Sequence, residues 1–180
     1  LHVVTHSFPT RRSSDLHSGV FGSAALNATH ALMEILSSVQ RQDGRLPKPL
    51  RAGIVPPTDE ELAAWAELVP GEQMLAEAGA QPVDPRATEE FYLRTTAEPS
   101  LEVNGILGGS PTLQKTVLPV QAEANISIRL APGQDVEQVG RALEQLLRDA
   151  APEGAELEVQ RLSSAPAALV PPDTPAIQLA

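Results

Sequence analysis

The four histidines, at positions 2, 6, 17 and 30, are the side chains of this sequence best suited to acid–base or metal chemistry. His2 and His6 have the four-residue spacing of a helical zinc site, but the stretch HVVTH lacks the glutamate that such a site uses as general base. His30 lies beside Leu32 and Met33 in an apolar helical pattern, which is typical of a structural histidine. Thiolate ligands are excluded because the chain contains no cysteine. We therefore expect no metal site among these residues.

A second candidate for chemistry is Arg129, the last polar residue of a strictly alternating stretch. Its planar guanidinium is suited to hold a carboxylate by two parallel hydrogen bonds, although an exposed strand arginine is more often only a solvated charge. Gly108 and Gly109 predict a mobile loop whose backbone can approach a ligand closely. Asn104, just before them, is as well suited to a turn hydrogen bond as to a ligand contact.

The composition restricts the class of protein that can carry these residues. The 180 residues have 42% hydrophobic content, which suits one globular domain, and a net charge of −10, which repels nucleic acid. No apolar run approaches the length of about 20 residues that crosses a bilayer, and no export signal follows the Arg11-Arg12 pair. We therefore expect a cytoplasmic protein with no nucleic-acid or membrane partner.

The first half of the chain predicts helices. Residues 24–40 carry one apolar stripe at helical spacing, and residues 41–57, rich in proline, glycine and arginine, predict an exposed connection. Thr58 and Glu61 form a capping box that begins a second helix, which Pro70-Gly71 ends. Further short helical segments, at 72–78 and 88–94, complete what we interpret as a helical insertion at 41–99.

The second half predicts a sheet and one more helix. A strand from Leu101 leads into the Gly108-Gly109 loop, and residues 122–130 alternate between apolar and polar side chains with a strict period of two. Asp135 caps a helix that ends near Pro152, and a last strand ends at Leu162. The order predicts an α+β fold: a two-layer split βαβ, or ferredoxin-like, sheet with its helices on one face and its first strand missing.

Five stretches, taken in order, resemble one known family: DLHSGVFGSA at 15–24, LEVNGILGG at 101–109, KTVLP at 115–119, ANISIRLAPGQ at 124–134 and PPDTPAIQLA at the end. They are similar to the dimerisation, or lid, domain of the zinc metallopeptidases that include carnosinases and cytosolic dipeptidases, aminoacylases and succinyl-diaminopimelate desuccinylases. The resemblance implies a lid domain at 17–170 and the start of a return into a catalytic domain at 171–180. The insertion is more similar to the dipeptidase branch than to the shorter desuccinylase lid.

The resemblance also implies roles for single residues. His17 is implied to cross a homodimer and donate a hydrogen bond to the oxygen that becomes negative when an amide is attacked, and Arg129 to bind the free carboxylate of a peptide. Thr116, Gly108 and Gly109 are implied to help orient the substrate. Two zinc ions are implied to be bound by a catalytic domain outside this sequence, so the 180 residues alone are expected to be inactive.

The substrate stays open at this point. Dipeptidases often carry a histidine just after the last lid strand, but this chain reads Arg161-Leu162-Ser163-Ser164 there. The substrate is then a small peptide or an N-acyl amino acid, and the second choice would make the protein an N-acyl amino acid amidohydrolase. A free-standing module that only mediates dimerisation is the alternative outside the enzymes.

Residues 1–16 fit none of these motifs. HSFPTRRSSDL, at 6–16, resembles the translation of a DNA-sequencing adapter joined to a coding sequence, so we interpret 1–16 as an artefactual leader. The β-branched content of the first five residues would allow them to lie beside the sheet in place of the lost strand.

Overall fold

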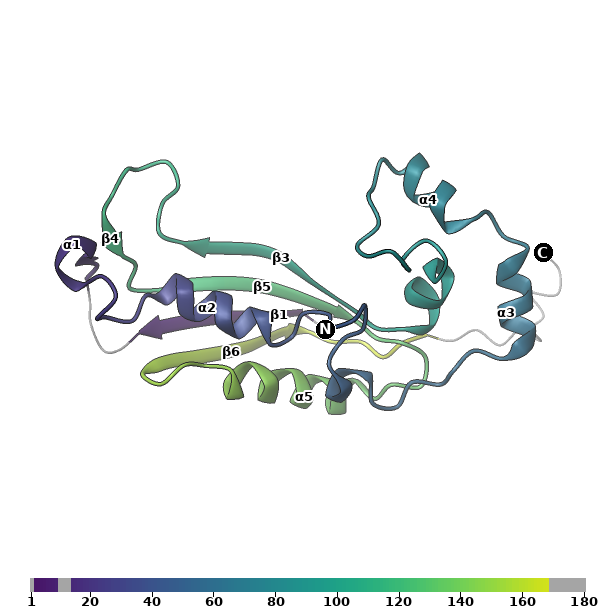
Figure 1. Cartoon of the computed structure of the whole chain (residues 1–180). Coiled ribbons are helices and arrows are strands. Elements are labelled where there is room, and N and C mark those ends of the chain that lie inside the picture. The colour runs from purple at the N-terminus through teal and green to yellow at the C-terminus, as the bar shows by residue number, and fades with distance from the viewer. Residues whose placement is uncertain (1, 10–13, 169–180) are drawn as a thin grey trace.

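The computed structural model describes residues 14–168 with their side chains and residues 2–9 by their backbone. Its centre is a four-stranded antiparallel sheet in the order β3 (Ser100–Gly108), β5 (Ala122–Arg129), β1 (His2–Pro9) and β6 (Ala155–Ser163). Helices α2 (Ala28–Ser37) and α5 (Val136–Asp149) cover one face of this sheet (Figure 1). The strand order is that of a split βαβ fold, so the expected α+β class is confirmed.

The place of the expected missing strand is occupied by the leader. We expected that its β-branched first residues could lie there, and β1 lies between β5 and β6 and pairs antiparallel with both. Without a strand there, both neighbours would expose unpaired backbone groups. The leader therefore supplies the strand that the sequence motifs do not.

Each helix over the sheet begins at a side-chain cap. Asn27 Oδ1 accepts from Thr29 N (2.9 Å) and His30 N (3.4 Å), so α2 begins at residue 28 and not at 24. Asp135 Oδ1 accepts from Gln138 N (2.7 Å) at the start of α5. The buried faces of the two helices meet the alternate apolar residues of β5, and this contact forms the core, which includes Leu32, Ile35, Leu36, Ile126, Ile128, Val139, Leu143 and Leu147.

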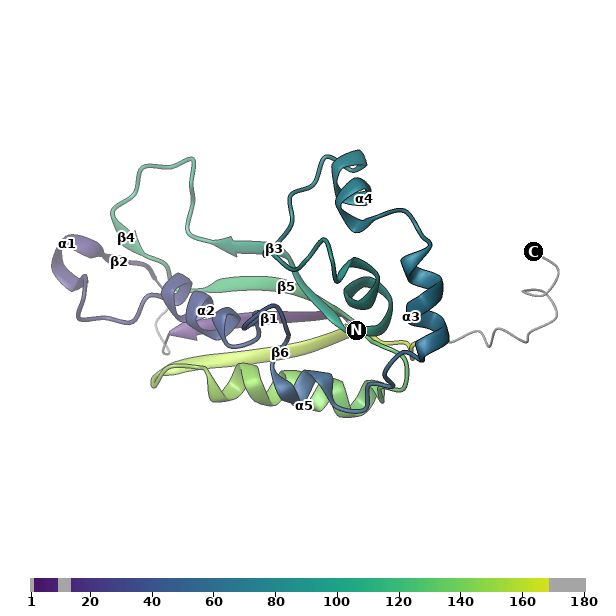
Figure 2. The same cartoon turned by 45° about the vertical axis from the view of Figure 1, so that its right-hand side comes forward.

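The segment between α2 and β3 forms the helical insertion, which lies at one end of the sheet (Figure 2). It contains the 3₁₀ helix η1 (Lys48–Arg51), α3 (Asp59–Ala66), α4 (Gly71–Glu77) and the π-helix η2 (Leu93–Ala97). The capping box before α3 is confirmed, because Thr58 N donates to Glu61 Oε2 (2.7 Å) and Glu61 N donates to Thr58 Oγ1 (3.2 Å). None of the residues of α3 is buried.

The opposite end of the sheet carries a small unit that the sequence patterns did not predict. β2 (Leu16–His17) pairs antiparallel with β4 (Val117–Leu118), and the short helix α1 (Ser18–Phe21) follows β2 directly. Both views place α1 and β4 at the end of the molecule that lies away from α3 and α4. A two-residue strand has no measurable period, so its pairing is set by tertiary contacts.

The two outer strands of the sheet have different chemistry. β3 carries no charged residue from Val103 to Gly108, and its Ile106 and Leu107 are exposed. β6 carries Glu156, Glu158 and Arg161, which is how native proteins commonly protect an outer strand from pairing. Among the described helices, none has both the length and the apolar composition that a membrane crossing requires.

Candidate functional site

His17 is held in one ring orientation by its own loop. It is the last residue of β2 and the N-cap of α1, and its Nδ1 accepts a hydrogen bond from Gly19 N (3.0 Å). A ring nitrogen that accepts has no proton of its own, so in the neutral ring the proton lies on Nε2. The residue is exposed, and His17 therefore presents a single N–H donor away from its own chain.

The glycines of the DLHSGVFG stretch are required by the same loop. A Cβ on Gly19 would lie 2.9 Å from His17 Cε1, and a Cβ on Gly22 would lie 2.4 Å from Ser18 O. The first glycine makes room for the imidazole, and the second lets Gly22 N donate to Ser18 O (2.8 Å) at the end of α1. The two glycines of the motif are thus explained by the loop that positions His17.

The structure brings Thr116 next to His17. Ser18 N donates to Thr116 O (2.8 Å), and His17 faces Val117 in the β2–β4 pair. Thr116 is exposed, as His17 is. His17 and Thr116 are therefore exposed polar residues of neighbouring strand ends.

Gly108 and Gly109 lie at this same end of the sheet. Gly109 has φ of 62°, a left-handed conformation that favours glycine, and lines a cavity of about 570 Å³ with Asp15 and Lys115. Gly108 lines the same cavity, and a Cβ there would lie 3.0 Å from Thr29 Oγ1 and 3.1 Å from Ala122 Cβ. Close packing against α2 and β5 therefore also favours glycine at position 108.

Arg129 lies at the other end of the sheet. It ends β5, faces Ser100 of β3 and is exposed. The small unit with His17 lies beyond the Ala122 end of β5, so the two residues are separated by at least the length of that strand, about 23 Å at 3.3 Å per residue. Within one chain the structure does not bring Arg129 together with His17 and Thr116.

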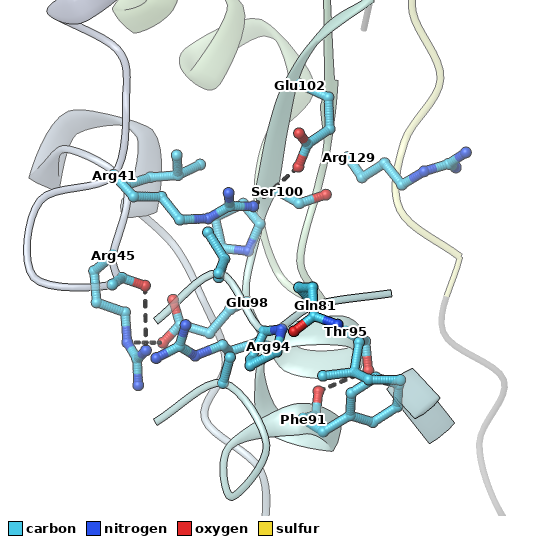
Figure 3. A pocket seen from close by; sticks show the side chains of 17 residues that line it. Arg41, Arg45, Gln81, Phe91, Arg94, Thr95, Glu98, Ser100, Glu102 and Arg129 are labelled. Carbon is cyan, nitrogen blue, oxygen red and sulfur yellow. Dashed lines mark hydrogen bonds and ion pairs between the residues drawn. The ribbon is translucent and has the colours of Figure 1, made fainter. Parts of the chain in front are cut away.

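The guanidinium of Arg129 has no carboxylate partner among the described residues. In Figure 3 the side chain extends away from Arg94 and Glu98 and toward the segment that follows β6. Arg129 lines a hollow of about 620 Å³ whose other walls are hydroxyl-rich and come from η2, β3, β5 and residues 163–167. An unpaired guanidinium in such a hollow is suited to an anionic group of a ligand.

An ion-pair cluster, which sequence patterns could not reveal, stands behind this hollow. Arg94 donates to Asp84 Oδ1 (3.0 Å) and to Glu90 Oε2 (2.6 Å), and Arg45 donates to Glu90 Oε2 (2.8 Å). The hydrogen bond from Arg94 lowers the pKa of Asp84 from 3.8 to about 2. Hydrogen bonds from Arg45 and Arg94 lower the pKa of Glu90 from 4.5 to about 2. The cluster joins the later part of the insertion, at residues 84–94, to Arg45 near its start.

The described residues do not fit a metal centre. No three of their histidine, aspartate and glutamate side chains are grouped so that they could hold an ion. His30 is exposed on α2 and belongs to no such group. The side chains of His2 and His6 lie outside the described residues, as does the segment 171–180 that was expected to return into a catalytic domain.

Curated proteins similar to this chain are dipeptidases by name. The Cys-Gly metallodipeptidase of Saccharomyces cerevisiae is 29% identical over 71% of this chain and 27% of its own length. The cysteinylglycine-S-conjugate dipeptidase of Corynebacterium striatum is 26% identical over 91% of this chain and 35% of its own. The Beta-Ala-His dipeptidase of Homo sapiens is 28% identical over 77% of this chain and 28% of its own. The chain thus spans about a third or less of the length of these relatives.

Solved structures agree on the fold. Human carnosine dipeptidase 1 superposes with a TM-score of 0.69 at 25% identity, over 88% of this chain and 35% of that protein. The Saccharomyces cerevisiae dipeptidase superposes with a TM-score of 0.67 at 25% identity, over 88% of this chain and 34% of that protein. Residues 12–155, which are most of this chain, match the family model of the peptidase dimerisation domain, and the chain therefore belongs to that family.

Proposed function

We propose that this chain is the lid and dimerisation part of a dinuclear zinc metallopeptidase of the dipeptidase type, in which His17 acts in the active site of the partner subunit. The observation that carries the proposal is the fixed, outward-facing Nε2–H of His17 at the end of the sheet away from Arg129. The names of the relatives support a peptidase, and the family supports a dimer. A cytoplasmic location is part of the same proposal.

The role of His17 is to stabilise charge. When an amide carbonyl is attacked, its oxygen gains negative charge that the substrate does not carry beforehand. A donor held ready for that oxygen lowers the barrier without tightening substrate binding, and its loss typically costs about 10²- to 10³-fold in rate. The Gly19 hydrogen bond assigns the donor role to Nε2, because it occupies Nδ1.

The separation of His17 and Arg129 is the reason for action across a dimer. A dipeptide is about 7 Å long, at roughly 3.5 Å per residue, whereas the two side chains are about 23 Å or more apart in one chain. One substrate therefore cannot contact both residues of the same subunit. We propose that each site combines Arg129 of one subunit with His17 and Thr116 of the other.

The uncharged outer strand β3 offers a way to build this arrangement. If two copies of β3 pair antiparallel about a two-fold axis, the Gly108 end of each strand lies beside the Ser100 end of the other. The small unit beyond Gly108 is then carried toward the neighbour's Arg129, which faces Ser100. A single homodimeric contact would thus assemble two composite sites.

The metals would be bound by a catalytic domain outside these 180 residues, as the family resemblance implies. Zinc would supply Lewis acidity there, and none of the described residues of this chain is suited to hold it. What this chain contributes is dimer contact, the Nε2–H donor and the Arg129 guanidinium. The 180 residues alone are expected to hydrolyse nothing.

The test uses a full-length protein that carries this lid. His17→Ala should lower kcat about 10²- to 10³-fold with unchanged metal content, and unaltered kcat would reject the donor role. His30→Ala, an exposed histidine of α2, is the matched control and should leave kcat unchanged. Mixing His17→Ala with a variant inactivated at its metal ligands should restore part of the activity, because one composite site in the mixed dimer is then intact.

The substrate class is tested on the same protein. A dipeptidase should hydrolyse dipeptides faster than N-acetyl or N-succinyl amino acids, and the opposite order would make the protein an N-acyl amino acid amidohydrolase. Both classes end in the free carboxylate that Arg129 is proposed to bind.

A further inference from the structure

A cavity of about 410 Å³, which we call the insertion cavity, lies between the helical insertion and the Ser100 end of β3 (Figure 3). Much of its wall is apolar, and Val83 of this wall is 67% exposed, so the apolar surface is open to solvent. Such a surface is stabilised when another apolar group covers it. The apolar residues of the wall include Leu46, Leu75, Val83, Ala87, Phe91 and Pro99.

The charged side chains of the insertion cavity are bonded to one another. The ion pairs are Arg41–Glu102 (3.0 Å), Arg45–Glu98 (3.5 Å) and Arg94–Glu90 (2.6 Å). Arg129 also lines the cavity, but Figure 3 shows its side chain extending away from Arg94 and Glu98. Because these charges are compensated, the cavity is suited to an uncharged apolar group and not to an ion.

The loop that joins β3 to β4, residues 109–116, carries a group of this kind. Leu113 is 55% exposed, and the sequence from Val103 to Gln114 contains no charged residue. The loop is bonded to itself on both sides of the leucine, because Leu113 N donates to Ser110 Oγ (3.3 Å) and Lys115 N donates to Leu113 O (2.8 Å). The backbone is thus held locally while the leucine side chain stays exposed to solvent.

Leu113 cannot reach the insertion cavity of its own chain. The cavity lies at the Ser100 end of β3, and the loop begins after Gly108, at the other end of this nine-residue strand. The two ends are about 26 Å apart at 3.3 Å per residue. The loop also has to return to β4, which both views place at the end of the molecule away from the insertion.

We propose that Leu113 of each subunit fills the insertion cavity of the other subunit in a homodimer. The inference rests on the proposed function, because it uses the antiparallel pairing of two β3 strands, and the family supports a dimer. In that pairing the Gly108 end of each strand lies beside the Ser100 end of its neighbour, so the loop after Gly108 is carried to the neighbour's cavity. Thr116 follows Leu113 by three residues, so the same contact would position Thr116 near the neighbour's Arg129.

Cross-linking tests the contact directly, because the unchanged chain contains no cysteine. Leu113→Cys and Val83→Cys are introduced into separate copies of the chain, which are mixed and treated with a short bis-maleimide. The linked heterodimer should form in at least about tenfold higher yield than in a control mixture of Leu162→Cys with Val83→Cys, because the contact raises the effective concentration of the two thiols. Equal yields in the two mixtures would overturn the inference.

Dimer strength gives a second measurement. Leu113→Ser should raise the dimer dissociation constant at least about tenfold in sedimentation, because each dimer loses two apolar contacts. Leu113 is exposed in the single chain, so this change leaves the fold of the subunit intact. Leu162→Ser on β6, where the leucine is 53% exposed, is the matched control and should leave the constant unchanged. A Leu113→Ser dimer as tight as that of the unchanged chain would contradict the contact.

The mixing experiment with His17→Ala distinguishes this failure from failure of the proposed function. If that mixture regains activity while Leu113→Ser leaves the dimer as tight as before, action across the dimer stands and the Leu113 contact is wrong. If the mixture regains no activity while the link between positions 113 and 83 forms in high yield, the Leu113 contact stands and the role of His17 in the partner is wrong.

Discussion

The ring of His17 is oriented by one hydrogen bond and by the absence of one methyl group. Gly19 N donates to Nδ1, and the Cα of Gly19 leaves the space in which the imidazole lies. Neither contact involves the core, so the ring is positioned by its own loop. Because these contacts are local, His17 can extend away from the domain while its ring keeps the Nε2–H tautomer.

At this scale we predict that Gly19→Ala displaces the ring. Its Cβ would lie 2.9 Å from Cε1 and 3.0 Å from Nδ1, so the imidazole must turn away and the hydrogen bond to Nδ1 is lost. Imidazole ¹⁵N chemical shifts of this chain should then no longer show a fixed Nε2–H tautomer. In the full-length protein kcat should fall about 10- to 100-fold, as expected for a misplaced catalytic group.

Ser18→Ala, the neighbouring substitution without a clash, should leave both the tautomer and kcat unchanged. If Gly19→Ala kept the Nε2–H tautomer, the ring would not be held as described.

The residues of the candidate site could be predicted from the sequence, but their arrangement in space could not. The motifs pointed to His17, Thr116 and Arg129, yet nothing in their spacing indicated that the first two lie together and the third lies at the far end of the sheet. The walls of the Arg129 hollow were missed, because Thr95 and Ser163 come from segments with no shared pattern. Thr95 and Ser163 come close only because the insertion folds back toward the sheet. Ion pairs between residues far apart in the sequence stabilise this arrangement.

The helices of this protein differ in the interactions that stabilise them. α5 buries Val139, Leu143 and Leu147 against the sheet, whereas α3 buries none of its residues and depends on its capping box and on the chain around it. Elements with few buried contacts open at lower free energy than the core. Two helix caps of equal strength should therefore contribute unequally to the free energy of unfolding of the domain.

We predict this difference for two helix caps. Asp135→Ala, which removes the cap of α5, should lower the free energy of unfolding by about 1 kcal/mol in a urea titration. Thr58→Ala removes a cap of similar strength from α3, but it should leave the global transition unchanged and only speed amide hydrogen exchange within 59–66. An equal fall for both variants would show that α3 unfolds together with the core.

The insertion should also respond to acid. Pairing with arginines holds the pKa of Asp84 at about 2, below 3.8, and the pKa of Glu90 at about 2, below 4.5. Carboxyls whose pKa is lowered by folding stabilise the folded form above their unfolded pKa, and this contribution is lost as the pH falls through the folded pKa. Docking of the insertion should therefore weaken between about pH 4.5 and pH 2.

Protection factors of residues 84–98, that is, their hydrogen-exchange rates relative to the unfolded chain at the same pH, check the expectation across that range. Asp84→Asn/Glu90→Gln should have lower protection factors at neutral pH and lose their dependence on acid. Unchanged protection factors in the parent chain down to pH 2 would contradict the role of the cluster.

At the scale of the molecule, the two outer strands predict where a second copy binds. β3 is uncharged from Val103 to Gly108 and is partly apolar at its surface, while β6 is charged. Antiparallel pairing of two β3 strands would extend the sheet through the dimer and satisfy the free backbone groups of both. Pairing through β6 would bring together two strands that each carry Glu156, Glu158 and Arg161.

We predict that Ile106→Lys dissociates the dimer. Ile106 is 59% exposed on β3, and a lysine on an outer strand disfavours pairing with a second strand. Sedimentation should show the dimer dissociation constant rising at least about tenfold. Leu162→Lys is the matched control on β6, where the leucine is 53% exposed, and it should leave the dimer intact. Dissociation by the control alone would move the interface to β6.

Most of the fold could be predicted from local patterns. The period of two in residues 122–130 and the apolar stripe after Asp135 define β5 and α5, and these elements supply about half of the core. The pairing of β2 with β4 could not be predicted, because Leu16–His17 is too short to have a period. The helix α2 is shorter than its stripe, because Asn27 caps it three residues into the apolar run.

The strand β1 precedes the residues 12–155 that match the family, yet it occupies an interior position between β5 and β6. The gap between β5 and β6 thus requires an extended segment with main-chain donors and acceptors. The side chains of that segment matter less. A version of the domain shortened by its first nine residues would then be a receptor for an octapeptide added in solution. The shortened domain and the peptide would then regain the fold only when they bind each other. Such strand complementation would make the lid usable as a split reporter.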